Sequence, residues 1–193
     1  MYNDPGIGTD LLEFIEIFNS GTNTVDVSNY YFMGVDFTFP AGTAIAPGDY
    51  KVIAFSASDM FATFGINTYQ WDGNSLGNSG EIVTLYNPLG EIVDQVPYDD
   101  GAGWPNAADG DGPSLILCDY NADNSLASNW NISSNYAGEY AGQSLYASPG
   151  VANNCGGCVT YNISENVAIC NGDTYTLPNG VITGTADTYS FTF

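Results

Sequence analysis

Two carboxylates stand close together near the start of the chain, in the stretch "EFIEIFNSG" (Glu13 to Gly21). A retaining glycosidase uses a pair of carboxyl groups about 5 Å apart on one side of its substrate. This stretch, however, is rich in Phe and Ile and ends in the turn cluster Asn-Ser-Gly, which predicts a strand. Residues three apart on a strand point to opposite faces, with Cα atoms roughly 10 Å apart. Glu13 and Glu16 therefore cannot form that pair, and we expect one of them to face the core and to need hydrogen-bond donors.

The absence of one residue type limits the chemistry further. The sequence contains no His. This excludes Ser-His-Asp and Cys-His nucleophile systems, His-ligated zinc and the commonest general base. Only chemistry by carboxylates alone is left open.

Charge is the extreme feature of the composition. Lys51 is the single basic residue against 22 acidic ones, and the formal net charge is −21. Such a surface repels nucleic acid and anionic membranes, because phosphate binding needs Lys and Arg. We therefore expect no nucleic-acid partner and no membrane insertion. Two interpretations of the charge stay open: a solvated, secreted surface that salt screens, or calcium binding.

Acidic side chains gather in two loop-like stretches, "DDGAGWPNAADGDGPSL" and "CDYNADNSLASNW". Oxygen ligands on a flexible loop suit calcium, and the weak candidates are Asp109, Asp111, Asp119 and Asp123. Neither stretch has the spacing of an EF-hand or of Asp-rich calcium repeats. We therefore favour turn-capping roles, in which the first loop packs Trp104 on the fold and the second anchors Trp130. On this interpretation the protein has no cofactor.

The spacing of turn residues along the chain predicts an all-β domain. Turn clusters recur about every ten residues, as in sandwiches and barrels. We expect strands at Glu13–Asn19, Val25–Tyr31, Tyr50–Phe55, Glu81–Tyr86, Glu91–Val96 and Ser114–Cys118. "TLYNPLGEIVDQV" predicts a hairpin. "SASDMFATFG" predicts the one helix, capped by Ser58 or Asp59, with Met60, Phe61 and Phe64 on its apolar face and Gly65 at its end.

The composition of the chain changes near residue 154, and we therefore place a domain boundary at 153/154. Residues 154–193 carry three of the four cysteines and are short for an independent domain, so they predict the truncated start of a second β module. We expect the chain to be a fragment of a longer protein. Disulfides are the default for cysteines of a secreted protein. The most economical partner for Cys118 is Cys155.

Aromatic residues offer two further alternatives. Exposed Trp and Tyr rings stack on sugars, whereas Trp in a sandwich is usually part of the core. The residues concerned are Tyr30, Tyr31, Phe32, Trp71, Tyr98, Trp104 and Trp130. We favour the core interpretation, and an exposed coplanar pair would favour sugar binding instead.

The order of several blocks resembles a known family. "EFIEIFNSG", "VDVSNY", "FTFPAGTAIAPGDYKVIA", "NSGEIVTLYNPLGEIVDQVPY", "ADGDGPSLILCD" and "SPGVAN" are similar in order to the bacterial lamin-tail domain. The resemblance covers residues 1 to 153 and implies an immunoglobulin-like β-sandwich in which "EFIEIFN" is a strand. The tail "ICNGDTYTLPNG" resembles the start of repeat modules of secreted bacterial surface proteins.

The resemblance also implies a function. It points to a non-enzymatic binding or structural module of a secreted, multidomain bacterial protein, which mediates adhesion, targeting or spacing at the cell surface or outside the cell. The alternative is a carbohydrate-binding module that targets an attached hydrolase to polysaccharide. The partners expected are neighbouring domains of the same chain and a protein or polysaccharide ligand, and we expect the chain to be a monomer.

Overall fold

The structure is a computed structural model that describes residues 1–6, 8–153, 175–176 and 182–183. The chain divides into two compact units, Met1–Cys155 and Gly156–Phe193. In the second unit the described residues form two short strands, β14 (Tyr175–Thr176) and β15 (Ile182–Thr183), which pair antiparallel.

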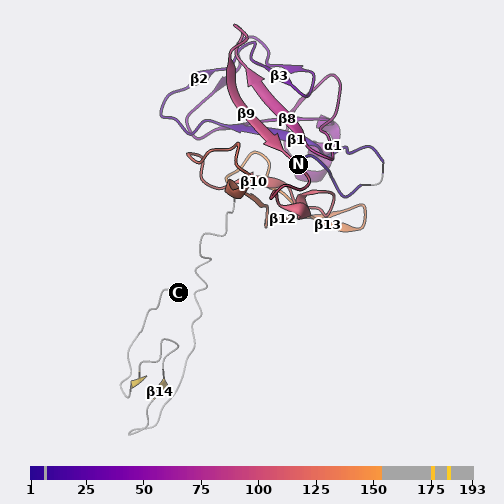
Figure 1. Ribbon diagram of the computed structural model, residues 1–193, viewed down its shortest axis with the longest axis vertical. Coiled ribbons are helices and arrows are strands. Elements are labelled where there is room, and N and C mark those ends of the chain that lie inside the picture. Colours follow the sequence, from indigo (N-terminus) through magenta and orange to yellow (C-terminus); the bar gives the residue numbers. More distant parts are fainter. Residues whose placement is uncertain (7, 154–174, 177–181, 184–193) are drawn as a thin grey trace. The chain divides into compact units, whose positions relative to one another are not determined.

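A four-stranded sheet forms one layer, in the order β4-β3-β8-β9 (Figure 1). Its strands are β3 (Tyr31–Met33), β4 (Phe37–Thr38), β8 (Glu81–Tyr86) and β9 (Ile92–Tyr98). The predicted hairpin joins β8 to β9. Two hydrogen bonds close its turn: the N–H of Gly90 donates to the carbonyl of Asn87, and the N–H of Asn87 donates to the carbonyl of Glu91. Gly90 has the positive φ that the turn requires.

A three-stranded sheet, in the order β1-β6-β7, forms the second layer. Strand β1 (Phe14–Phe18) pairs antiparallel with β6 (Tyr50–Ala54), and β7 (Tyr69–Gln70) pairs parallel with β6 after the helix α1 (Ala57–Phe64). A small pair, β2 (Val25–Asp26) with β5 (Ala44–Ile45), extends this part of the fold. The two sheets enclose what we call the first core, which includes Phe32, Val35, Phe39, Ile53, Trp71, Val83 and Leu85. The predicted all-β sandwich with one short helix is confirmed.

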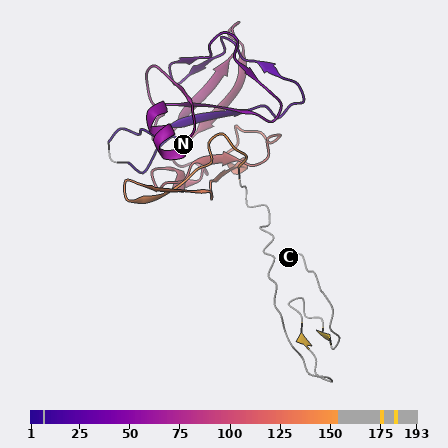
Figure 2. The ribbon, with the colours of Figure 1, turned by 180° about the vertical axis from the view of Figure 1, so that it is seen from behind.

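The other face of the β1-β6-β7 sheet is also covered. Figures 1 and 2 show β10, β12 and β13 on the opposite side of β1 from β8 and β9. This third layer contains the pair β10 (Leu115–Leu117) with β11 (Trp130–Ile132), the pair β12 (Tyr136–Tyr140) with β13 (Gln143–Tyr146), and the 3-10 turns η1 (Asn106–Ala108) and η2 (Ala127–Asn129). With α1 it encloses the second core, which includes Leu12, Phe14, Val52, Met60 and Leu145.

The helix begins and ends for identifiable reasons, one of which corrects the sequence analysis. Its N-cap is Ser56, not Ser58 or Asp59: the Ser56 hydroxyl accepts the N–H of Asp59 at 3.3 Å. Gly65 ends the helix in the left-handed conformation, as predicted. Met60 is fully buried, but Phe61 is 56% exposed, so the prediction that Phe61 lies on the apolar face is wrong.

The strand predicted over Val25–Tyr31 is also wrong as a single element. It divides into β2 and β3, because a turn lies between them. Asn29 has a φ of 63°, and the Asp26 carboxylate accepts the N–H of Ser28. Asp and Asn side chains stabilise such turns, so "DVSN" interrupts the strand. Among the described residues, no helix is long and apolar enough to cross a membrane.

Candidate functional site

The first of the two carboxylates, Glu13, is a buried structural group. It lies just before β1 and is 1% exposed. Its carboxylate accepts the N–H of Leu76 at 2.8 Å, which supplies the donor that burial demands. Burial raises the pKa of Glu13 to about 7, because a low-dielectric surrounding disfavours the charged form. One of the two carboxylates thus faces the core with a donor, as the sequence predicted.

The second carboxylate, Glu16, lies on the other face of the same strand. It is half-buried and accepts the N–H of Gly150 from the third layer. Burial raises its pKa to about 7 as well, and the bond from Gly150 opposes the shift. Leu76 and Gly150 donate to carboxyl groups on different faces of β1, so Glu13 lies on the side of the first core and Glu16 on the side of the third layer. They do not converge on one substrate position.

Strand β1 pairs with β6 along one edge and with Met1 at the other. Its N–H and C=O groups alternate in direction, as in any antiparallel ladder. The carbonyl of Glu13 and the N–H of Asn19 bond toward the β6 side, so the odd-numbered residues face β6. Phe14 faces the other way, where it exchanges both backbone bonds with Met1, at 3.0 and 3.1 Å. Glu16 must face the same way as Phe14.

The backbone N–H and C=O groups of Glu16 and Phe18 also point away from β6, since these residues follow Phe14 at period two. Within the described part of the chain, no group pairs with them there. The antiparallel ladder on this side of β1 runs through Met1, the first residue of the sequence, so its next partners would be residues ahead of Met1.

An apolar cavity of about 490 Å³ lies beside this edge of β1. Residues of β1, β8, β9 and β10 line it, together with Trp130 and Tyr120. Val83, Leu85 and Val96 form its wall on the side of the four-stranded sheet. A cavity of this volume falls in the range of ligand sites.

The acidic loops hold their aspartates in turns. Asp119 accepts the N–H of Asn121, and Asp123 accepts the N–H and the hydroxyl of Ser125. Asp109 accepts the side-chain amide of Asn3 at 2.7 Å, and Asp111 is exposed. In the part of the chain that the structure describes, no three acidic, His or Cys side chains come together as metal ligands would. That these residues bind no calcium stays a prediction.

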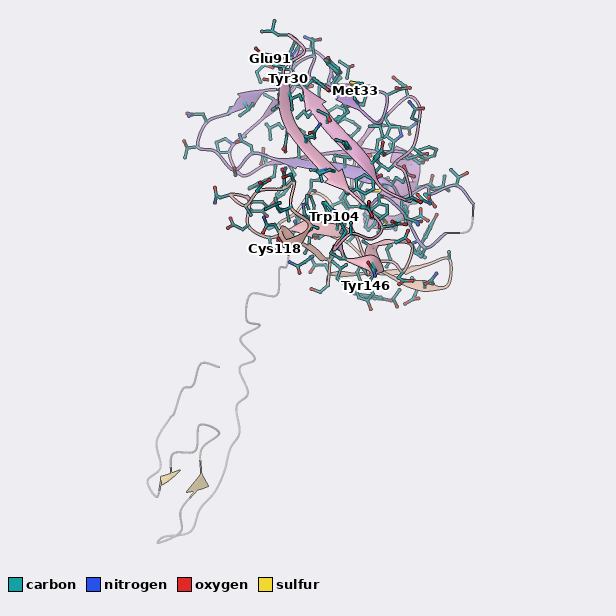
Figure 3. All side chains as sticks on the ribbon, in the orientation of Figure 1. Tyr30, Met33, Glu91, Trp104, Cys118 and Tyr146 are labelled. Carbon is teal, nitrogen blue, oxygen red and sulfur yellow. The ribbon has the colours of Figure 1, made fainter. Side chains whose placement is uncertain are left out.

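The tryptophans of these loops have the structural roles that the sequence predicted. Trp104 (labelled in Figure 3) is buried in the first core. Its ring packs against that of Trp130, with ring centroids 5.8 Å apart. The indole N–H of Trp130 donates to the carbonyl of Asn124 at 2.9 Å. The loop after β10 therefore anchors Trp130, and the carboxylate of Asp99 caps its own turn through the N–H of Gly101.

Most of the aromatic residues considered for sugar binding are core residues. Phe32, Trp71 and Tyr98 are buried, as Trp104 is, so none of them can offer a ring face to a polysaccharide. One pair differs: Tyr31 and Tyr86 lie opposite each other on β3 and β8, with centroids 5.2 Å apart and planes at 11°. Both are half-buried, and they stack on one another, so they do not form a flat platform side by side.

Cys118 lies at the end of β10 (Figure 3), where the side-chain amide of Asn131 approaches its sulfur at 3.9 Å. Its predicted partner, Cys155, lies outside the described residues. The Cys118–Cys155 disulfide therefore stays a prediction.

The cavity beside β1 was missed in the sequence analysis. The signal was present in part, because "MYNDPG" has the pattern of a strand running into a turn. The pairing of Met1 with Phe14 could not be predicted, because pairing partners are not encoded in local periodicity.

Comparison with known proteins gave one match. Residues 1–100 match the family model described as the Lamin Tail Domain. The matched region contains β1 to β9, and so both sheets of the sandwich and the β1 edge. No curated protein and no solved structure matches the chain.

Proposed function

Since the chain belongs to the lamin tail domain family, an immunoglobulin-like β-sandwich, we propose that it is a protein-binding module of a secreted, multidomain bacterial protein, in which it mediates adhesion, targeting or spacing. The family supports a non-catalytic structural or binding role. Protein as the ligand, and the cell surface or the extracellular space as the location, are our proposals.

The observation that supports protein binding best is the apolar cavity of about 490 Å³ beside β1. An apolar cavity takes the apolar side chains of a protein ligand. It does not suit a polysaccharide, which is bound through ring stacking and hydroxyl groups.

Charge narrows the class of partner. With one basic residue and a formal net charge of −21, the chain favours neutral or basic proteins and disfavours nucleic acid. Neighbouring domains of the same protein are also candidate partners. We propose that the module itself is a monomer.

A carbohydrate-binding module remains the second candidate because Tyr31 and Tyr86 form an aromatic pair on the outer face of the four-stranded sheet. Exposed apolar neighbours, Met33 and Ile82, enlarge this face. The pair supports sugar binding less well than a platform would, since each ring covers part of the other.

Two parallel assays distinguish the candidates. In the first, random peptides displayed on phage are selected on the immobilised chain, and enriched peptides are measured in solution. In the second, the chain is run by native electrophoresis in gels that contain a soluble polysaccharide, either xylan or glucan. We expect enriched peptides that bind and no retardation by polysaccharide. Absence of any binding peptide, together with retardation that Tyr31→Ala abolishes, would replace our proposal with the carbohydrate-binding one.

A further inference from the structure

We propose that the outer face of the four-stranded sheet docks an amphipathic helix of a partner protein, with apolar residues along one side of the helix and Lys or Arg at both of its ends. This inference rests on the proposed function as a protein-binding module and gives that module a second contact surface, apart from the cavity beside β1. The strands β3, β8 and β9 form the face (Figure 1), and all three lie within residues 31–98.

The outer face is uncharged on a strongly acidic protein. Residues directly opposite each other in a sheet share a face, and the register of β3, β8 and β9 places three rows on this side. The rows are Tyr31 with Tyr86 and Ile92, Met33 with Thr84 and Gln95, and Ile82 with Pro97. None of these side chains is charged, although the chain has 22 acidic residues. A contiguous uncharged surface on such a protein marks an interaction site.

The composition of the face suits burial against an apolar partner. Met33, Ile82 and Ile92 are each more than half exposed. The two polar members of the face bond to each other, because the Gln95 side-chain amide donates to the Thr84 hydroxyl at 2.9 Å. Covering the face therefore removes apolar surface from water and leaves this polar pair bonded.

The adjoining edge of the sheet is closed to an added strand. Strand β9 is the last in the order β4-β3-β8-β9, so one of its edges has no neighbouring strand in the described part of the chain. Pro97 has no N–H to offer there, and the N–H of Gln95 already donates to the Asp94 carboxylate at 2.8 Å. Proline and charged side chains on an edge strand oppose pairing with another chain. A partner therefore meets the face of this sheet and not its edge.

The dimensions of the face match one helix. Three neighbouring strands span about 10 Å, and a helix with its side chains is about 10–12 Å across. From Ile92 to Pro97 a strand runs roughly 16 Å, which about eleven helical residues cover. A helix of three turns that lies along the strands thus covers all three rows, with its apolar residues at i, i+3, i+4 and i+7.

Carboxylates flank the face at both ends of β9. Glu91 precedes the strand and is exposed, and Asp99 and Asp100 directly follow it. Basic residues at both ends of the docked helix complement these charges. A second copy of the chain is a poor occupant, because its net charge of −21 repels the first copy.

Two synthetic peptides of equal composition test the helical stripe. The probe is acetyl-Lys-Lys-Leu-Ala-Ala-Leu-Leu-Ala-Ala-Leu-Lys-Lys-amide, whose leucines line one side of a helix. In the control, acetyl-Lys-Lys-Leu-Ala-Leu-Ala-Leu-Ala-Leu-Ala-Lys-Lys-amide, the leucines alternate as on a strand and spread around a helix. Isothermal titration calorimetry with the complete chain at physiological salt should show binding of the probe at least about tenfold tighter than binding of the control. Equal affinities, or no binding of the probe, would overturn the proposal.

Matched variants of the chain test the place of binding. The double substitution Met33→Gln with Ile82→Gln makes the face polar and should weaken binding of the probe at least about tenfold. Phe61→Gln is the control, because Phe61 on α1 is 56% exposed, as Met33 is, and lies outside this sheet. It should change the affinity by less than about threefold. Thermal melts verify folding, and Ile92→Gln replaces the double variant if that variant does not fold. Equal effects of the face variant and Phe61→Gln would contradict docking on this face.

Two further outcomes separate this inference from the proposed function. If peptides selected on phage bind the double variant as tightly as the wild-type chain, the module binds protein elsewhere: this inference fails and the proposed function stands. If xylan or glucan retards the chain and the double variant abolishes the retardation, the face binds polysaccharide and not a helix, and this inference fails.

Discussion

Glu13 and Glu16 stand three residues apart at β1 and bond to opposite sides of the sheet, Glu13 to the N–H of Leu76 and Glu16 to the N–H of Gly150. Two carboxyl groups are the residue types that a glycosidase uses, but these two point to opposite faces of a sandwich strand. Each carboxyl group joins β1 to a different layer, so both are structural in this fold. Their raised pKa values come first from burial.

The buried carboxyl group of Glu13 should make stability depend on pH. Its pKa rises from 4.5 to about 7 on folding, so the protonated form favours the native state. Its contribution is therefore complete below pH 4.5 and is lost as pH rises through 7. Relative to Glu13→Gln, the wild-type chain should lose about 2 kcal/mol of unfolding free energy between pH 5.5 and pH 8.

The comparison with Glu13→Gln is needed because another buried group acts in the opposite sense. Burial lowers the pKa of the Met1 amino group to about 5, so this group favours folding as pH rises from 5 to 8. The difference between wild type and Glu13→Gln in urea titrations cancels this effect. A difference that does not vary with pH would show that Glu13 ionises normally in the folded state.

The helix cap offers a sharp test of the fold around α1. Ser56→Ala removes the side-chain acceptor for the N–H of Asp59 and should lower the free energy of unfolding by about 1 kcal/mol. Ser58→Ala is the matched control, because Ser58 is exposed and does not cap the helix. It should change stability by less than about 0.5 kcal/mol. A larger loss from Ser58→Ala would move the cap to the position that the sequence suggested.

Gly112 should be irreplaceable in the third layer. Its φ is +108°, and a Cβ there would collide with the carbonyl oxygen of Ser144. Gly112→Ala should therefore cost more than about 2 kcal/mol in chemical denaturation. Gly142 also has a positive φ, at +82°, but open space surrounds it, so Gly142→Ala should cost about 1 kcal/mol. Equal losses would mean that strain alone, and not the collision, matters at Gly112.

Calcium and magnesium should raise the melting temperature equally at matched ionic strength. The aspartates at 109, 119 and 123 are held by Asn or by turn N–H groups, so we expect general screening of the acidic surface. A true site would select calcium, which accepts more oxygen ligands than magnesium. A calcium-specific rise of several degrees, abolished by Asp109→Ala or Asp123→Ala, would establish a site in these loops.

Long strands with clear turn signals could be predicted from the sequence. Glu81–Tyr86 is β8 residue for residue, and Asn87 to Gly90 form its hairpin turn. The expectation that one of Glu13 and Glu16 faces the core followed from the alternation of β1 alone, and the structure shows that Glu13 is the buried one. These features depend on local patterns, and local patterns are what a single sequence contains.

Features that depend on tertiary context could not be predicted. The hairpin of β12 and β13 was missed because its turn places Ala141 at a φ of 50°, where Asn or Asp would have been the usual signal. The apolar cavity beside β1 was missed because it depends on which strands meet, and not on the composition of β1 itself.

Amide hydrogen exchange along β1 tests the place of this strand in the sandwich most directly. The N–H groups of Ile15 and Ile17 bond to β6 and should be protected in the folded chain, whereas those of Glu16 and Phe18 point away from β6 and should exchange faster. Exchange of Ile15 and Ile17 as fast as that of Glu16 and Phe18 would contradict the pairing of β1 with β6, and with it the placement of the two carboxyl groups against different layers.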